Sequence, residues 1–130
     1  MKLIIDCNVF ISAALGSKTC QKALDNAFMF HDVYYSAFIF EEIKTTFNKP
    51  KLKKIKEFSK QFLQPLLILG TCIEAEPCQT ILNDIKDQEY LNVAVFIEAD
   101  AIVTGNTAHF SEEQYEGVRV FSPRMLADLH

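Results

Sequence analysis

The chain has 130 residues, of which 49% are hydrophobic, and its formal net charge is −4. This length predicts a single domain over residues 1–130 that buries roughly two-thirds of its unfolded surface without needing a disulfide or metal staple. The negative net charge argues against wholesale attraction to nucleic acid, although the distribution of charge matters more than its sum. No apolar run approaches the roughly 18 residues of a membrane span, so we expect no membrane partner.

The cysteines indicate the compartment. Cys7, Cys20, Cys72 and Cys78 show no C-x-x-C spacing, and no histidines cluster beside them, which argues against a structural zinc site. Because no secretory leader precedes the first apolar run, we expect reduced thiols and a cytoplasmic location.

The presence of 11 Phe and no Trp predicts an aliphatic core filled with phenylalanine.

The first half of the chain alternates strand and helix patterns. The apolar run at residues 2–5 predicts a strand buried on both faces, and residues 20–29 have helical spacing. β-branched and aromatic residues predict a short strand at 32–36. The helix predicted next, over 37–47, ends near Pro50.

The middle of the chain is mostly helical in pattern. Residues 51–63 repeat the helical spacing, whereas the run 66–69, closed by Gly70, fits either a buried strand or the end of a helix. A loop is predicted at 74–79, because this segment contains Pro77.

The last third returns to alternation. Asp84 opens the clearest helix of the chain, and residues 101–105 predict a strand followed by a turn. A final strand is predicted at 118–121, followed by a helix with Ser122 as its N-cap and Pro123 in its first turn. This alternation of strands and helices predicts an α/β fold with a mainly parallel sheet.

Asp6 stands directly after the first predicted strand. Open α/β sheets bind ligands at the carboxyl ends of their strands, so Asp6 is a candidate functional residue. The alternative is an N-cap for the helix that follows from Asn8. Further polar residues, near Glu42, at 84–87 and at Asn106, recur where the chain would return to the same edge of the sheet.

Each of these positions also has an ordinary structural explanation. Glu41 and Glu42 lie early in a predicted helix, where acids favour the helix macrodipole and face solvent. Asp84 and Asp87 resemble a capping box, and Asn106 follows a glycine turn where a cap is common.

Taken together, the acids suggest a cation site. Three carboxylates about 4 Å apart would repel each other by ~4 kcal/mol per pair, and a hard divalent cation removes that cost. Oxygen ligands without nearby His or Cys favour Mg²⁺ or Mn²⁺ over Zn²⁺. His109 we interpret as a partly buried structural histidine rather than a ligand.

Four segments carry a further signal through their order and spacing: residues 4–13, Ser36 with Glu42 and Ile43, residues 84–94, and residues 99–106. Together they resemble the PIN-domain family, most closely the toxin branch of type II toxin-antitoxin systems. The resemblance runs from residue 2 to about residue 126. It implies a compact PIN-like α/β/α sandwich and a metal-dependent endoribonuclease activity.

The resemblance also implies roles for individual residues. Asp6, Glu42 and Asp87 match the acidic site that binds Mg²⁺ or Mn²⁺, and Glu42 matches it better than Glu41. The catalytic set adds Asn106, which stands where the family usually has a fourth aspartate and supplies no negative charge. The supporting residues would be Asn8, Ser12, Asp84 and Thr104.

The requirements of phosphodiester hydrolysis suggest a role for each residue of this set. Asp6 and Asp87 would ligate the metal directly, Glu42 would bind a second metal or position the water, and Asn106 would orient water or phosphate. Lysines are frequent between residues 49 and 60, and we expect four of them to bind the RNA backbone: Lys51, Lys53, Lys54 and Lys56. The alternative for this segment is a solvated helix face.

Three functions remain open at this point. The first is the ribonuclease, with RNA and a cognate antitoxin protein as partners and a homodimer as the expected assembly. The second, motivated by Asn106, is a catalytically weak or inactive PIN fold that binds RNA or protein. The third is a phosphatase with Asp6 as its nucleophile, but that chemistry usually needs a second acid at position 8, which is Asn.

Overall fold

The computed structural model describes residues 1–106 and 108–130. The strands are β1 (Lys2–Ile5), β2 (Asp32–Tyr35), β3 (Thr71–Cys72), β4 (Ala101–Val103), β5 (Gln114–Tyr115) and β6 (Val118–Phe121). The α-helices are α1 (Cys7–Ala14), α2 (Lys18–Phe30), α3 (Ala37–Phe47), α4 (Ser59–Leu69), α5 (Ile85–Phe96) and α6 (Pro123–Asp128), and a 3-10 helix, η1 (Pro50–Phe58), joins α3 to α4.

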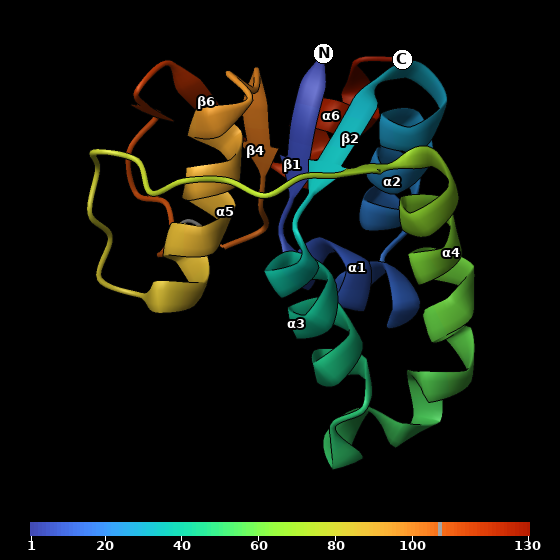
Figure 1. Cartoon of the computed structure of the whole chain (residues 1–130). Helices are drawn as coiled ribbons and strands as arrows, with labels where there is room; N and C mark the ends of the chain where they lie inside the picture. Colours follow the sequence, from blue (N-terminus) through green and yellow to red (C-terminus); the bar gives the residue numbers. More distant parts are fainter. Residues whose placement is uncertain (107) are drawn as a thin grey trace.

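The strands form one six-stranded sheet in the order β3-β2-β1-β4-β6-β5 (Figure 1). All neighbouring pairs are parallel except β5 and β6, which pair in antiparallel fashion. The predicted α/β fold with a central, mainly parallel sheet is therefore confirmed.

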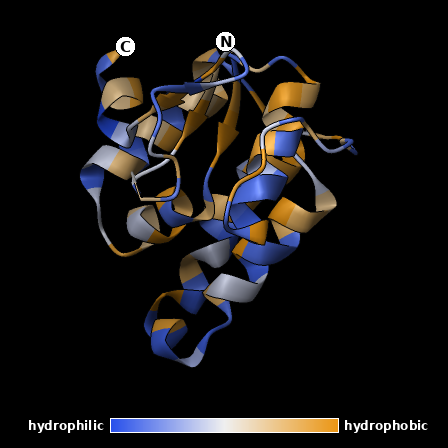
Figure 2. Ribbon diagram, turned by 90° about the vertical axis from the view of Figure 1, so that its left-hand side faces the viewer, coloured by the Kyte–Doolittle hydropathy of each residue, from blue (hydrophilic) through white to orange (hydrophobic). Residues whose placement is uncertain are grey.

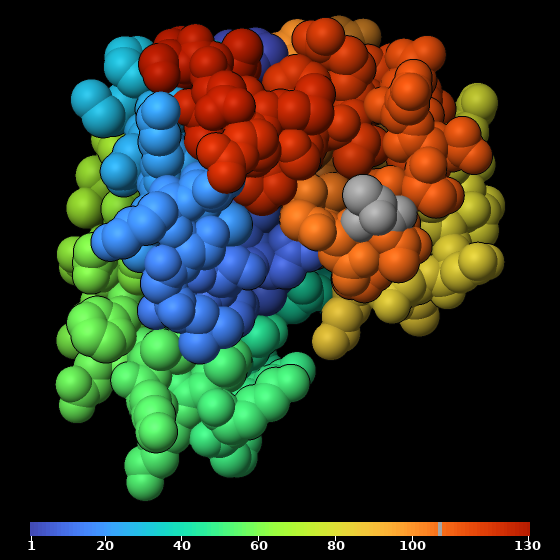
Figure 3. Space-filling view, turned by 180° about the vertical axis from the view of Figure 1, so that it is seen from behind, coloured from blue at the N-terminus to red at the C-terminus, as the bar shows by residue number. Residues whose placement is uncertain are grey.

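Helices cover both faces of this sheet. Helix α5 packs on one face, and α2 and α6 lie side by side on the other, where Figure 3 shows them as adjoining blue and red surfaces. The central strands are apolar (Figure 2) and their side chains are buried, with Leu3, Ile4 and Ile102 fully enclosed. Double coverage explains why the strand sequences are continuous hydrophobic runs rather than alternating ones.

Capping side chains fix where most helices begin. Ser17, Ser36 and Ser122 each accept a hydrogen bond from the N–H three residues further on, and these bonds open α2, α3 and α6. Asp84 opens α5 by accepting a hydrogen bond from the N–H of Lys86. Helix α1 is different, because Asp6 occupies its N-cap position without making a capping hydrogen bond with its side chain.

One predicted segment differs from the structure, and the structure decides between the two alternatives for another. Residues 51–63 do not form one α-helix: the chain follows η1 to Phe58 and becomes α-helical only at Ser59. The run 66–69 is the end of α4 rather than a buried strand, and only Leu66 points into the core, while Ile68 is 73% exposed. The two-residue strands β3 and β5 were not predicted, because so short a segment has no measurable period.

The phenylalanines divide between the core and the surface. Phe10, Phe47 and Phe110 are fully buried, but Phe30 and Phe96 are more than half exposed, so the predicted phenylalanine filling of the core is only partly correct.

All four cysteines are free thiols. Within the described residues, none of the helices has the length and apolar character needed to cross a bilayer.

A buried amide holds the last helix on the sheet. The side-chain Nδ2 of Asn26, on α2, donates to the carbonyl oxygens of Leu126 and Ala127, each at 3.2 Å. These carbonyls lie at the end of α6, where the helix itself supplies no donors.

We predict that Asn26→Ala lowers the free energy of unfolding by about 2 kcal/mol, because two buried carbonyls lose their donor. Chemical unfolding in urea measures this change. The control is Asp25→Ala, whose side chain on the same helix is exposed and should cost less than about 0.5 kcal/mol. Equal costs for the two variants would contradict the role of Asn26.

Candidate active site

The order of the strands places a crevice beside β1. The chain leaves β1 towards β2 and β3 on one side, and it later returns to β4 on the other side. Ligands of open α/β sheets bind at such a switch point, outside the carboxyl ends of the strands. Because Ile5 pairs with Val103, the residues that follow these two strands, Asp6 and Thr104, come side by side.

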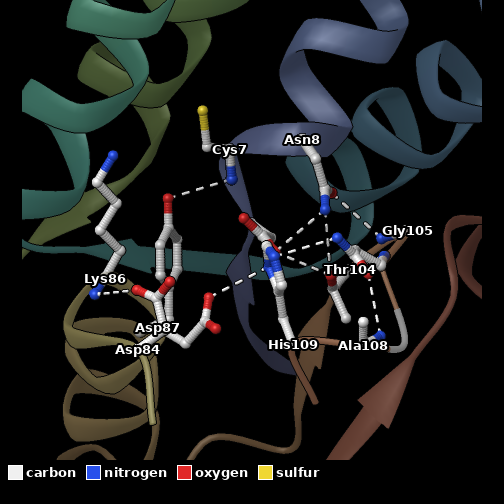
Figure 4. A network of polar contacts seen from close by, with 12 residues as sticks. Cys7, Asn8, Asp84, Lys86, Asp87, Thr104, Gly105, Ala108 and His109 are labelled. Carbon is white, nitrogen blue, oxygen red and sulfur yellow. Dashed lines mark hydrogen bonds and ion pairs between the residues drawn. The ribbon is translucent and has the colours of Figure 1, made fainter. Parts of the chain in front are cut away.

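Asp6 is held by groups from both strand ends. Its Oδ2 accepts hydrogen bonds from Thr104 Oγ1 at 2.8 Å and from Asn8 Nδ2 at 3.3 Å, and Figure 4 shows Asn8 and Thr104 close together at this point. The side chain is buried, which raises the pKa of Asp6, while the Thr104 hydroxyl acts in the opposite direction. The side chain of Asp6 therefore faces the crevice and does not cap α1.

Asp87 lies in the first turn of α5 and faces the same crevice. It is buried, and burial is the main reason why its pKa is raised from 3.8 to about 6. The charges of Asp84, Asp6 and Glu42 add to this increase, and His109 opposes it. Asp84 is exposed, and its Oδ1 accepts a hydrogen bond of 2.7 Å from the Lys86 N–H, so it acts as the cap of α5.

Glu42 reaches the site through Tyr90. The Tyr90 hydroxyl donates to Glu42 Oε1 at 3.0 Å and accepts a hydrogen bond from the Cys7 N–H at 3.1 Å. Glu42 Oε2 is buried and has no hydrogen-bond partner in the described part of the chain, and burial raises the pKa of Glu42. Its neighbour Glu41 is exposed. The structure thus places Glu42 near Asp6 and Asp87 and turns Glu41 towards solvent.

Asn106 is linked to the acids indirectly, through His109. Asn106 Oδ1 accepts a hydrogen bond from the Ala108 N–H at 3.0 Å, and its Nδ2 lies 3.1 Å from His109 Nε2. The other ring nitrogen of His109, Nδ1, lies 3.2 Å from Asp87 Oδ1 and 3.9 Å from Asp6 Oδ2 (Figure 4). His109, which we interpreted from sequence as a structural histidine, therefore lies between two of the acids.

Two residues of the site escaped the sequence analysis. His109 stands three residues after Asn106, but only the conformation of the loop after β4 directs its ring towards the acids. Tyr90 lies on the helix predicted from Asp84, and it is buried, yet its hydroxyl connects Glu42 to the start of α1. Its position one helical turn after Asp87 was the available signal, because residues three apart share a helix face.

The remaining predicted residues lie farther from the acids. Ser12 is half-buried in the second turn of α1, and among the described residues its hydroxyl forms no hydrogen bond with the acids. The predicted RNA-binding lysines are exposed on η1, which forms a tip that projects beyond the carboxyl edge of the sheet (Figure 1). Two other lysines are closer: Lys49 and Lys86 line a hollow of about 200 Å³ together with Glu42.

The donor chemistry of the site fits a hard divalent cation. The three acids offer only oxygen atoms, and the unpartnered oxygen of Glu42 is a buried acceptor that a cation would satisfy. Among residues 1–106 and 108–130, however, no three His, Cys, Asp or Glu side chains are grouped tightly enough to hold a metal ion. Cation binding would therefore have to draw the carboxylates closer together.

The fold and the site define a doubly wound α/β protein with an acidic crevice at its switch point. Residues 2–108 match the PIN domain family, and the chain belongs to this family, as the sequence resemblance predicted. PIN domains are generally nucleases that use divalent metals.

One solved structure shows the same fold over nearly the whole chain. It is the crystal structure of VapBC2 from Rickettsia felis bound to a DNA fragment from their promoter, with a TM-score of 0.65 and 12% sequence identity. The superposition covers 94% of this chain and 98% of the matched one. At this identity the similarity shows the fold alone. No curated protein matches the chain.

The raised pKa of Asp87 predicts how stability changes with pH in the absence of divalent cations. The pKa of Asp87 is about 6 in the folded chain, against about 3.9 for an unfolded aspartate, so folding favours the protonated acid. This contribution is fully present below about pH 3.9 and is lost as the pH rises through about 6, at a cost of at most about 3 kcal/mol.

Urea unfolding in EDTA at several pH values between 5 and 7.5 measures this dependence. Asp87→Asn should flatten it and should be more stable than the natural protein at pH 7.5, because the variant has no charge to bury. Glu41→Gln, which changes an exposed acid, is the matched control and should retain the natural slope. A slope unchanged by Asp87→Asn would contradict the assignment.

Proposed function

We propose that the chain is a metal-dependent endoribonuclease that hydrolyses RNA phosphodiester bonds. The observation that carries this proposal is the burial of Asp6, Asp87 and one carboxylate oxygen of Glu42 around the switch point of a PIN fold. Bound Mg²⁺ or Mn²⁺ would supply an activated water and neutralise the charge that develops on the phosphate. The chain's own residues prepare the site for that chemistry.

Asp6 and Asp87 are the proposed metal ligands. The Thr104 hydroxyl and the Asn8 amide hold one oxygen of Asp6 in place, which limits the directions from which this carboxylate can bind a cation. Tyr90 similarly engages one oxygen of Glu42, while the other has no partner among the described residues, so Glu42 can bind a second cation or orient the attacking water. Asn106 acts through His109, since its side chain is directed there.

The proposed biological role is that of the toxin in a type II toxin-antitoxin pair. One structural neighbour comes from a VapBC2 complex, and this supports an antitoxin protein as a partner of the chain. The end of α4 exposes Leu67, Ile68 and Leu69, an apolar stretch of the kind that protein partners cover. A homodimer is a further proposed assembly. An RNA-cleaving toxin would act in the cytoplasm, where its substrate lies.

One observation favours a second candidate function. Asn106 supplies no charge, and the three acids are not grouped tightly in the described structure, so the site fits a weakly catalytic or inactive module that binds RNA or protein. The phosphatase hypothesis has less support. At position 8, where that chemistry needs a second acid, the amide of Asn8 instead donates to Asp6.

The ribonuclease proposal predicts that purified protein cleaves a mixed RNA pool in Mg²⁺ or Mn²⁺ and that EDTA abolishes cleavage. Asp6→Asn and Asp87→Asn should each reduce the rate roughly 100-fold or more, because they remove charged ligands from the site. Gel analysis of labelled RNA measures the rate, and Glu41→Gln is the control that should cleave normally.

The alternatives give different outcomes in the same assay. RNA binding without cleavage in any metal would favour the binding module. Cleavage that persists both in EDTA and in Asp6→Asn would contradict the metal-dependent mechanism, because that mechanism places the cation on Asp6.

The lysines of η1 give a separate prediction. If Lys51, Lys53, Lys54 and Lys56 contact phosphates, replacing all four by Gln should weaken RNA binding and reduce the slope of log K against log salt by about 0.7 per lost contact, up to about 3. Fluorescence anisotropy at several salt concentrations measures the slope. Lys18→Gln/Lys22→Gln, on exposed positions of α2, is the control. Equal slopes for the natural protein and the four-lysine variant would indicate that η1 is a solvated helix face that does not contact RNA.

A further inference from the structure

We propose that His109 competes with the divalent cation for Asp6 and Asp87, and that Asn106 holds His109 in the competing position. The inference rests on the proposed function, because it concerns the same acidic site. His109 was not among the predicted metal ligands, and the proposal makes it a competitor of the metal. Asn106 then has the role of positioning His109 rather than contacting water or phosphate.

The first argument is the location of the imidazole. His109 Nδ1 is 3.2 Å from Asp87 and 3.9 Å from Asp6, whereas the two carboxylates come from different elements, α5 and the end of β1. A cation shared by these carboxylates would have to occupy the region that the ring nitrogen now fills. Figure 4 shows the His109 side chain between Asp87 on one side and Asn8 and Thr104 on the other.

The second argument is the direction of the hydrogen bonds. Asn106 Oδ1 already accepts a bond from the Ala108 N–H, so the group of Asn106 that faces His109 is the Nδ2 amide, which can only donate. In a neutral imidazole with this partner, Nε2 is the acceptor and the ring proton lies on Nδ1. The Nδ1–H therefore points at the carboxylates and donates to Asp87.

This arrangement excludes His109 as a metal ligand in the position where it lies. A ligand nitrogen needs a lone pair directed at the cation, but Nδ1 carries the proton and the lone pair of Nε2 is engaged by Asn106. The Nδ1–H dipole also repels a positive ion that approaches the two acids. His109 must therefore move aside before a cation can bridge them.

The structure provides room for this movement. The His109 side chain is 40% exposed and lies in the loop that follows β4. It borders a hollow of about 440 Å³, whose wall also includes Ser111 and Tyr115. The proposal requires the ring to move into this adjacent space.

Isothermal titration of the full chain with Mn²⁺ at a fixed pH of 7.5 tests the proposal. His109→Ala should tighten Mn²⁺ binding roughly tenfold, the equivalent of losing one hydrogen bond to a charged acceptor. Asn106→Ala should tighten it by a smaller factor, and the double variant should bind no more tightly than His109→Ala, because both changes remove the same competitor. His130→Ala, which alters an exposed histidine, should leave the affinity unchanged.

The expected gain of affinity distinguishes competition from a structural role, since a damaged site would bind Mn²⁺ more weakly. Adding Asp87→Asn to His109→Ala should abolish the gain, which assigns the titrated ion to this site. Weaker binding in His109→Ala would make His109 a ligand, and unchanged binding would make it a bystander. Either result overturns the inference while leaving the proposed nuclease site standing.

A different result would count against the nuclease itself. If neither the natural protein nor His109→Ala binds Mn²⁺ at millimolar concentration, the metal site fails and the competition fails with it. If only His109→Ala binds, both the site and the competition are supported.

Discussion

The site depends on keeping Asp6, Glu42 and Asp87 together where water is largely excluded. Burial raises the pKa of each of these acids, and the charges of neighbouring acids raise the pKa of Glu42 and Asp87 further. An apolar residue at any of these positions would fold at lower cost, so three acids at one crevice conflict with the packing of the core. Such conflicts are expected where a sequence serves function rather than stability. The surrounding groups reduce the cost, since hydroxyls and an amide donate to the carboxylates, and they leave one oxygen of Glu42 without a partner.

The topology of the sheet determines where this conflict can be accommodated. A parallel strand that is buried on both faces can carry polar residues only beyond its ends, and β1 and β4 end in register. Asp6 and Thr104 therefore meet without any long-range adjustment of the chain. The first turn of α5 brings Asp87 to the same edge, and the side chain of Tyr90, one turn later, connects Glu42 of α3 to the backbone of α1. The ends of two strands and the start of one helix thus position most of the site.

The sequence predicted the parts of this arrangement that follow from local pattern. Asp6 was identifiable because a buried strand and a carboxylate at its end are both visible in the chain, and the same holds for Asp84 as a helix cap. Glu42 could not be separated from Glu41 by spacing alone, because both lie early in α3, and the family resemblance made that choice. The position of His109 between two acids could not be predicted, because it depends on loop conformation and on a contact with Asn106, neither of which has a periodic signal. The lysine tip was predicted as an α-helix because the spacing of its apolar residues does not distinguish that helix from the 3-10 form.

The exchange of an acid for Asn106 changes more than the charge of the site. An aspartate at position 106 could only accept a hydrogen bond, and it would favour a proton on Nε2 of His109, which would leave Nδ1 free to accept or would make the ring a cation. In a neutral imidazole the amide favours the opposite arrangement, with the proton on Nδ1 and directed at Asp87. The chain thereby places a ring N–H donor of its own beside two of its carboxylates. In the proposed nuclease, cation binding would then depend on the free energy needed to displace one imidazole from two acids, rather than on a simple count of the acids that remain.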